Sequence, residues 1–261
     1  MNGTPYSLLA ADEPAPIIVH NENGLSPFVI VVDHAGNSLP RALGRLGVPE
    51  SELARHIAWD IGIAAVSRFV ADALDATLVQ QNYSRLVIDC NRAPGSQTSI
   101  PEISEFTPIP GNVSLNEVQK DARLREIFQP YHDRIKAELD RRWREGRPAA
   151  LIALHSFTPV FMGAARPWHA GVLYNRDARF ANMLIASLRR EEGLIVGDNE
   201  PYSVTDESDY TIPVHGERRG LLHVEVEIRQ DLIAGDSGQR AWGALLAHLL
   251  PLAYQALATA S

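Results

Sequence analysis

Two histidines stand just after apolar runs of strand length. His34 comes two residues after the run Phe28–Val32, and His155 directly follows the run at residues 149–154. In α/β proteins the carboxyl ends of strands gather on one side of the sheet and build the binding site. Imidazole is the commonest metal ligand, and a catalytic zinc needs three protein ligands with one open position. A single histidine at a strand end more often packs or caps, but the matched contexts of the two favour a site for Zn²⁺ or another divalent metal.

Two residues are candidates for the third ligand. Asp60 lies four residues after His56 in a segment with helical periodicity, so the two side chains can share a metal or simply hydrogen-bond. Asn37 lies three residues after His34, at a spacing where a charged carboxylate would be the better zinc ligand. We rank Asp60 first and interpret Asn37 as a weaker ligand or as a group that orients one.

A second source of chemistry is the alternating segment LLHVEVEIRQD at residues 221–231. Strand geometry puts His223, Glu225, Glu227 and Arg229 on one face of it and apolar residues on the other. That polar face is either the solvated side of an edge strand or a buried wall beside the metal. In the second case a glutamate can take a proton from activated water and pass it to a leaving nitrogen.

Three further residues could bind an anion. Arg85 begins a predicted short strand at residues 85–89, and Asn91 and Arg92 follow its end. The planar guanidinium fork suits a carboxylate, so this group could hold an acidic substrate terminus. The alternative is an arginine paired with an acid of the protein itself, such as Asp89.

The elements that must position these residues alternate along the chain. Strands separated by helices predict an α/β sandwich around a mostly parallel or mixed sheet, in one domain that spans residues 1–261. Predicted strands lie at residues 28–32, 77–80, 85–89, 149–154, 171–174 and 221–228, and predicted helices at 50–72, 115–144 with a division near Pro130, and 179–191.

Composition excludes several classes of protein. The 261 residues carry 24 Lys and Arg against 32 Asp and Glu, and the resulting charge of −8 argues against a nucleic-acid partner. The single cysteine, Cys90, excludes an intramolecular disulfide and a cysteine-based zinc cluster, and we interpret it as a packing residue. Nothing in the sequence indicates an oligomeric state.

Neither end of the chain predicts a membrane segment. The first residues lack the basic and apolar stretches of a secretory signal, so we expect a cytoplasmic protein. Residues 241–260 carry no acidic or basic side chain over the length of a membrane span, but glycine, histidine and proline interrupt them. Leu245, Leu249 and Leu252 recur at helical spacing, so we expect a terminal helix docked on the core and bent at Pro251.

Six motifs in this order resemble the N-formylglutamate amidohydrolase family. They are DHAGN at residues 33–37, HIAWD at 56–60, SRLVIDCNR at 84–92, LHSFTP at 154–159, GDNEPY at 197–202 and EIRQDL at 227–232. The resemblance runs from about Val31 to Leu232 and is to the N-formylglutamate amidohydrolase-like branch. This family is related to zinc carboxypeptidases and aspartoacylases, which implies a three-layer α/β/α globule around a mixed central sheet.

The resemblance also implies roles for individual residues. His34 and His155 match the zinc-binding histidines of these families, whereas Asn37 stands where a glutamate ligand is expected. Glu227 resembles the general base, and Arg85 resembles the arginine that stabilises the oxyanion. The pair Asn91 and Arg92 resembles the pair that grips the carboxylate of the substrate.

One further segment is expected to contribute to specificity. The polar loop at residues 202–215 is a candidate lid or pocket wall, in which Tyr210 and His215 are the expected substrate-binding residues.

Three hypotheses about function follow. The first is a zinc-dependent hydrolase that cleaves the amide bond of a small, anionic N-acyl amino acid such as N-formylglutamate. The second keeps the site but changes the bond, as in a metallopeptidase or a deacylase acting on another carboxylate-bearing amide. The third, motivated by Asn37 in place of a carboxylate, is a metal-free binding protein without catalytic activity.

Overall fold

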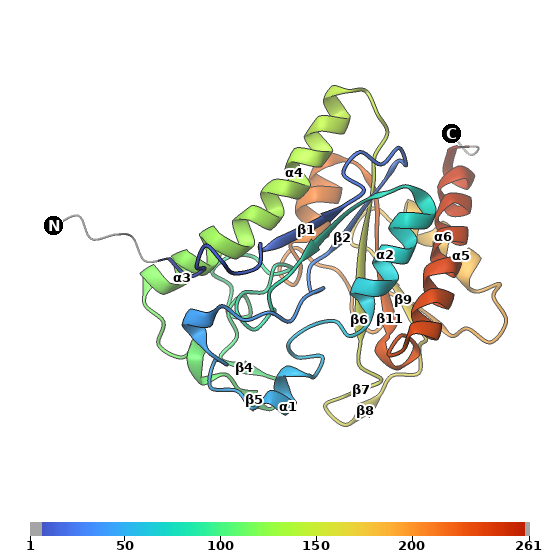
Figure 1. Ribbon diagram of the computed structural model, residues 1–261. Coiled ribbons are helices and arrows are strands. Elements are labelled where there is room, and N and C mark those ends of the chain that lie inside the picture. Colours follow the sequence, from blue (N-terminus) through green and yellow to red (C-terminus); the bar gives the residue numbers. More distant parts are fainter. Residues whose placement is uncertain (1–6, 259–261) are drawn as a thin grey trace.

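A seven-stranded mixed sheet runs through the middle of the computed structural model, which describes residues 7–258 (Figure 1). Its four central strands, β3, β2, β6 and β11, run parallel, whereas β1, β9 and β10 run in the opposite direction. The strand order is β1 (Ile17–His20), β3 (Thr77–Gln81), β2 (Phe28–Val32), β6 (Ala150–Phe157), β11 (Leu222–Arg229), β9 (Ala170–Leu173) and β10 (Val196–Asp198).

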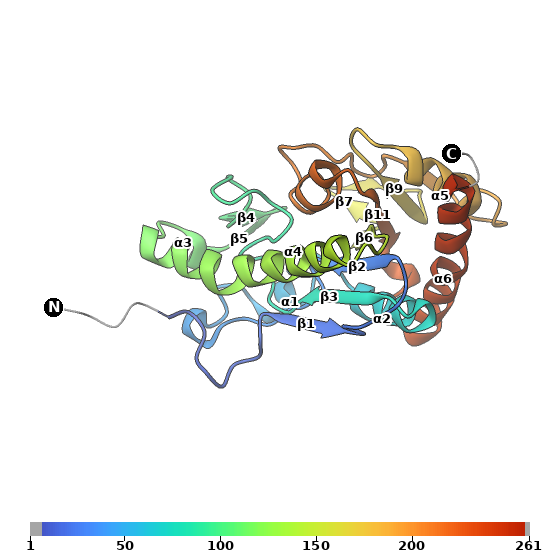
Figure 2. The same ribbon diagram turned by 90° about the horizontal axis from the view of Figure 1, so that it is seen from above.

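Helices cover both faces of this sheet, so the predicted three-layer α/β/α architecture is confirmed (Figures 1 and 2). On one face lie α2 (Ile63–Leu74), α5 (Arg179–Leu188) and α6 (Asp236–Ala258), and on the other lie α3 (Glu117–Arg123) and α4 (Gln129–Arg144). Strand β2 shows why both layers are needed. Its side chains alternate between the two apolar cores and all of them are buried, as is typical of a strand covered on both sides.

Two predicted elements are wrong in ways that matter for the site. The predicted helix at residues 50–72 is divided into α1 (Glu50–Leu53) and α2, with a non-helical loop at residues 54–62 between them. The predicted strand at residues 85–89 is a buried turn, because Val87 N donates to Ser84 O and Arg85 N to Ala58 O instead of joining the sheet. Its apolar side chains pack in the core below α4, so the burial was predicted but the backbone was not.

The other elements lie close to their predicted positions. The long predicted helix at residues 115–144 becomes α3 and α4, joined by a π-helical turn at Leu124–Phe128 just before Pro130. Strands β1 and β10 and two small hairpins were not predicted. The hairpins pair β4 (Ile103–Ser104) with β5 (Thr107–Pro108) and β7 (Val160–Phe161) with β8 (Ala164–Ala165).

The terminal helix α6 packs against α2 and α5. Its buried face contains Trp242, Leu246 and Leu250 as well as the predicted Leu249, whereas Leu252 is 46% exposed, so the predicted stripe was only partly correct. The helix continues through Pro251, and residues 259–260 of the uncharged stretch lie outside the described residues. Within residues 7–258, no helix has the length and apolar character that crossing a membrane requires.

Candidate metal and active site

Three of the four predicted metal ligands lie together at the carboxyl ends of β2 and β6. His34, Asp60 and His155 are buried, and each offers a ligand atom within 4.8 Å of the others. Asp60 Oδ2 lies 2.9 Å from His155 Nδ1 and 3.5 Å from His34 Nδ1. Asn37 does not join them, because its side chain is exposed and donates to the carbonyl oxygen of Leu53.

Asp60 reaches this position by a different route from the predicted one. It lies in the loop between α1 and α2, where its backbone N–H donates to His34 O at 2.9 Å. Gly62 permits the turn that follows, because it has a φ of +83° and an added Cβ would stand 2.2 Å from Ile233 O. His56 therefore does not share a helix face with Asp60, and its Nε2 lies 3.4 Å from Glu105.

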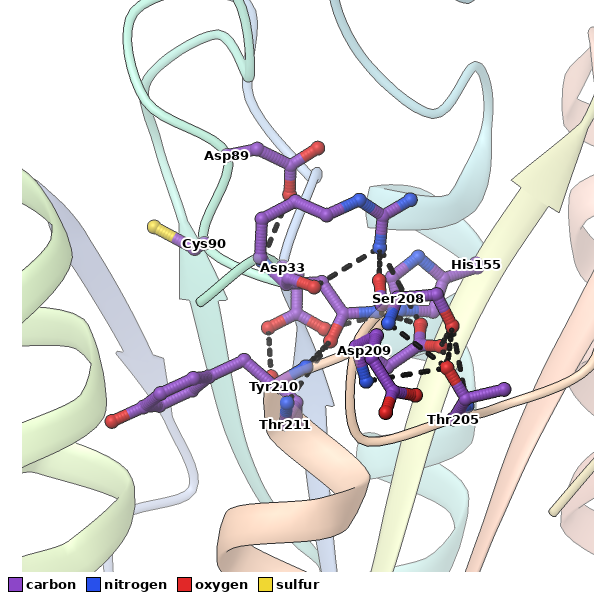
Figure 3. Close-up of polar contacts among 12 residues, drawn as sticks. Asp33, Asp89, Cys90, His155, Thr205, Ser208, Asp209, Tyr210 and Thr211 are labelled. Atoms are coloured by element: carbon purple, nitrogen blue, oxygen red, sulfur yellow. Dashed lines mark hydrogen bonds and ion pairs between the residues drawn. The ribbon is translucent and has the colours of Figure 1, made fainter. Parts of the chain in front are cut away.

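A second pair of carboxylates orients the two imidazoles. His34 Nε2 bonds Asp89 at 2.7 Å, and His155 Nε2 bonds Asp33 at 3.1 Å. Asp33 also accepts a hydrogen bond from Thr211 (Figure 3). Burial disfavours the charged form of Asp33, but the hydrogen bond and charge of His155 outweigh it and lower the pKa of Asp33 to about 2. Both rings thus turn Nδ1 toward Asp60.

This donor set fits a divalent cation. His34 Nδ1 is buried and has no hydrogen-bond partner among the described residues, although an imidazole nitrogen normally has one. Two imidazoles and one carboxylate, each imidazole bonded to an outer acid, are the usual surroundings of a catalytic zinc. The three buried side chains could therefore hold such an ion.

Glu227 faces the same group from β11. Strand β11 lies between β6 and β9, so the alternative of a solvated edge strand is wrong. Glu227 is paired in register with His155, and its Oε2 has no hydrogen-bond partner among the described residues. Burial and the charge of Asp60 raise the pKa of Glu227 to about 7, although His155 acts in the opposite direction. A carboxyl group with such a pKa can accept and return a proton near neutral pH.

Arg85 is paired with Asp89, an acid of the protein itself, which was the predicted alternative to binding a substrate carboxylate. Its Nη2 and Nε donate to Asp89 Oδ2 at 2.8 and 3.1 Å, and its Nη1 lies 3.4 Å from Asp60 Oδ1. The guanidinium also lines the pocket above the metal ligands, so it contacts both the outer acid and the space for a substrate.

Asn91 and Arg92 line the pocket too, but their polar atoms bind the loop that follows β10. Asn91 Nδ2 donates to Asp209 at 3.0 Å, and its Oδ1 accepts from the backbone N–H groups of Tyr210 and Thr211. Arg92 Nη1 donates to Ser208 O and lies 3.5 Å from Asp209 Oδ1. The pair predicted to bind a substrate anion, Asn91 and Arg92, thus contacts the carboxylate of Asp209 instead.

The two residues predicted within the loop at residues 202–215 do not line the pocket. The Tyr210 ring extends away from Asp33 and His155 in Figure 3 and packs on Phe128 and His132. His215 is buried behind it, with Nε2 at 3.0 Å from His132 Nδ1. Instead, Tyr202, Ser203, Ser208 and Asp209 are the residues of this loop that line the pocket.

The pocket itself has a volume of about 480 Å³, which suits a small molecule. Asp33 and Asp209 were not predicted as members of the site, and Glu225 was predicted only to share a strand face with Glu227. Asp33 was visible as the acid beside His34, and Glu225 as the neighbour of Glu227 on one strand face. No sequence signal brings Asp209 to Asn91, because their contact joins two loops that are far apart in the chain.

Comparison with known proteins agrees with the motifs. The sequence matches the family described as N-formylglutamate amidohydrolase over residues 26–234. The crystal structure of a gene product from Agrobacterium tumefaciens is 36% identical, with a TM-score of 0.93 over 96% of this chain and 99% of that chain. N-formylglutamate amidohydrolase from Ralstonia eutropha shares the fold, at 16% identity and a TM-score of 0.66 over 93% of this chain and 98% of that one. No curated protein matches the sequence. The chain therefore belongs to the N-formylglutamate amidohydrolase family, the family that its motifs resemble, and acts on an amide bond.

Proposed function

We propose that this protein is a metal-dependent hydrolase that cleaves the amide bond of a small N-acyl amino acid, with N-formylglutamate as the first compound to test. The observation that carries the proposal is the group of three buried donors, His34, Asp60 and His155, within 4.8 Å of one another. Zinc or another divalent ion is the cofactor that such a donor set suits.

The protein residues then have distinct roles. A divalent ion held by these donors supplies Lewis-acid chemistry, which lowers the pKa of water and polarises a carbonyl group. Glu227 accepts the proton of the attacking water and returns it to the leaving nitrogen, since its free Oε2 lines the pocket opposite His155. Arg85 donates to the developing oxyanion while Asp89 holds the other edge of its guanidinium.

Two measurements test this proposal together. Metal analysis of the purified protein, followed by titration with Zn²⁺, should give one ion per chain. N-formyl-glutamate, N-acetyl-glutamate and glutamyl dipeptides, assayed side by side, should then separate a deformylase from a deacylase and a peptidase. A protein that takes up no metal and cleaves none of these compounds would contradict the proposal and favour the non-catalytic binding protein.

A further inference from the structure

Glu225 is a buried carboxyl group in the middle of β11. It is 3% exposed, and its Oε2 contacts no donor among the described residues. Its register partners on the two neighbouring strands are Ala153 on β6 and Leu173 on β9, and neither side chain can donate a hydrogen bond. Buried polar groups normally have a hydrogen-bond partner. The described residues supply none for this oxygen, so a bound ligand could supply it.

The carboxyl group is directed to the substrate pocket. Glu225 and Glu227 both line it, two residues apart on the same face of β11. Since a strand rises about 3.3 Å per residue, Glu225 lies about 7 Å deeper in the sheet than the proposed base. A group that binds Glu225 would therefore lie several bonds from the nitrogen of the cleaved amide, as the terminal nitrogen of a lysine side chain does.

Glu225 shares the pocket with the acids Asp209 and Glu227 and with the imidazole of His155. Asp209 also lines the pocket and contacts the predicted anion-binding pair, Asn91 at 3.0 Å and Arg92 at 3.5 Å. The second arginine of the pocket, Arg85, is paired with Asp89 and Asp60. A substrate carboxylate placed at Glu225 would meet these acids, whereas an ammonium group would supply the missing donor and an opposite charge.

We propose that Glu225 is a specificity-determining residue that binds an amino or guanidino group at the end of the substrate's side chain. This inference rests on the proposed amide hydrolysis and names its substrate class: N-acyl derivatives of basic amino acids. Asp209 contributes negative charge to the same end of the pocket. Its carboxylate is held by Ser208 and Thr205 as well as Asn91, so it is a fixed part of the wall.

Three substrates that differ in side-chain charge test the inference. We would measure kcat and KM for N-formyl-lysine, N-formyl-norleucine, which has a similar length without the charge, and N-formyl-glutamate. The wild-type enzyme should prefer the lysine compound to the norleucine compound by about 10- to 100-fold in kcat/KM, the range for a charge-assisted hydrogen bond. Glu225→Gln should remove this preference mainly through KM, because the amide keeps the shape and loses the charge.

The control is Glu207→Gln. Glu207 is an exposed acid in the loop that carries Asp209 and does not line the pocket, so its replacement should leave the preference for the lysine compound unchanged. A wild-type preference for the glutamate compound, or an unchanged lysine preference in Glu225→Gln, would overturn the inference.

A binding measurement separates this inference from the proposed reaction. If the zinc-loaded wild-type protein cleaves no compound, the proposed function fails, and calorimetry with N-acetyl-lysine and N-acetyl-norleucine still tests Glu225. Tighter binding of the lysine compound that is lost in Glu225→Gln supports the basic subsite. Equal binding of the two compounds by the wild-type protein refutes it.

Discussion

Replacing Asn91 by alanine tests whether this side chain stabilises the folded protein or binds the substrate. Its side chain accepts from two backbone N–H groups and donates to Asp209, all at 3.0 Å, and it is 3% exposed. Alanine leaves the N–H of Thr211, a residue with no exposed surface, without its side-chain acceptor, and it removes the hydrogen bond to the carboxylate of Asp209.

The expected loss follows from these bonds. An unsatisfied buried donor costs about 1–3 kcal/mol, and a hydrogen bond to a charged group contributes about 1.5–3 kcal/mol, so the free energy of unfolding should fall by about 3 kcal/mol. For a chain of this size, that corresponds to a decrease in Tm of about 6 °C.

Urea unfolding at fixed zinc concentration would measure the change. Gln129→Ala is the control, because that amide is exposed, donates only to the exposed carboxylate of Asp133 at 3.0 Å and should contribute less than about 0.5 kcal/mol. If Asn91→Ala unfolds like the wild-type protein but has a raised KM, Asn91 binds the substrate. The interpretation of its contact with Asp209 as a structural one would then be wrong.

Three further predictions concern the metal, the base and the buried histidines. Glu227→Gln should lower kcat by about 100-fold or more with unchanged metal content, and full activity would exclude Glu227 as the base. Asp60→Ala should bind less than one zinc per chain after dialysis, and wild-type metal content would exclude Asp60 as a ligand. Burial lowers the pKa of His132 to about 4 and of His215 to about 3, below the unfolded value near 6.5. The unfolded chain therefore binds more protons than the folded protein below pH 6.5. As the pH falls below this value, the free energy of unfolding should decrease by up to about 1.4 kcal/mol per pH unit for each histidine. His215→Gln should reduce that slope in urea unfolding between pH 7 and pH 5, and an identical slope would refute the assignment.

Residues at strand ends were predictable because sheet geometry leaves little freedom there. The runs that lead to His34 and His155 are continuously apolar, and such runs form central strands whose carboxyl ends meet. The alternation around Glu227 fixed the face that it shares with Glu225. Its burial was not predictable, because periodicity does not tell whether a neighbouring strand covers the other edge.

Turns and loops were predicted less well, for physical reasons that differ. The apolar residues at 85–89 correctly predicted that this segment is buried. The backbone hydrogen bonds to Ala58 and Ser84 make it a turn and not a strand. Helical periodicity continued through residues 54–62, where the bond from Asp60 N to His34 O and the close approach of Gly62 to Ile233 oppose a helix. Asp60 was thus selected as a ligand through a spacing that the structure does not contain.

The site therefore divides into a part fixed by the sheet and a part fixed by side-chain contacts between loops. His155 and Glu227 are held in register by a parallel pair of strands, and Asp60 is held by a backbone bond, so these groups need no particular neighbour to face one another. Asn91 and Asp209 meet only through their own side chains, 118 residues apart. A match of motifs consequently specifies the chemistry at the strand ends more strongly than the substrate. The Asn-Arg pair, for which the resemblance implies a substrate carboxylate, binds an aspartate of its own chain here. In our proposal, Glu225 and the acids near it therefore select the substrate.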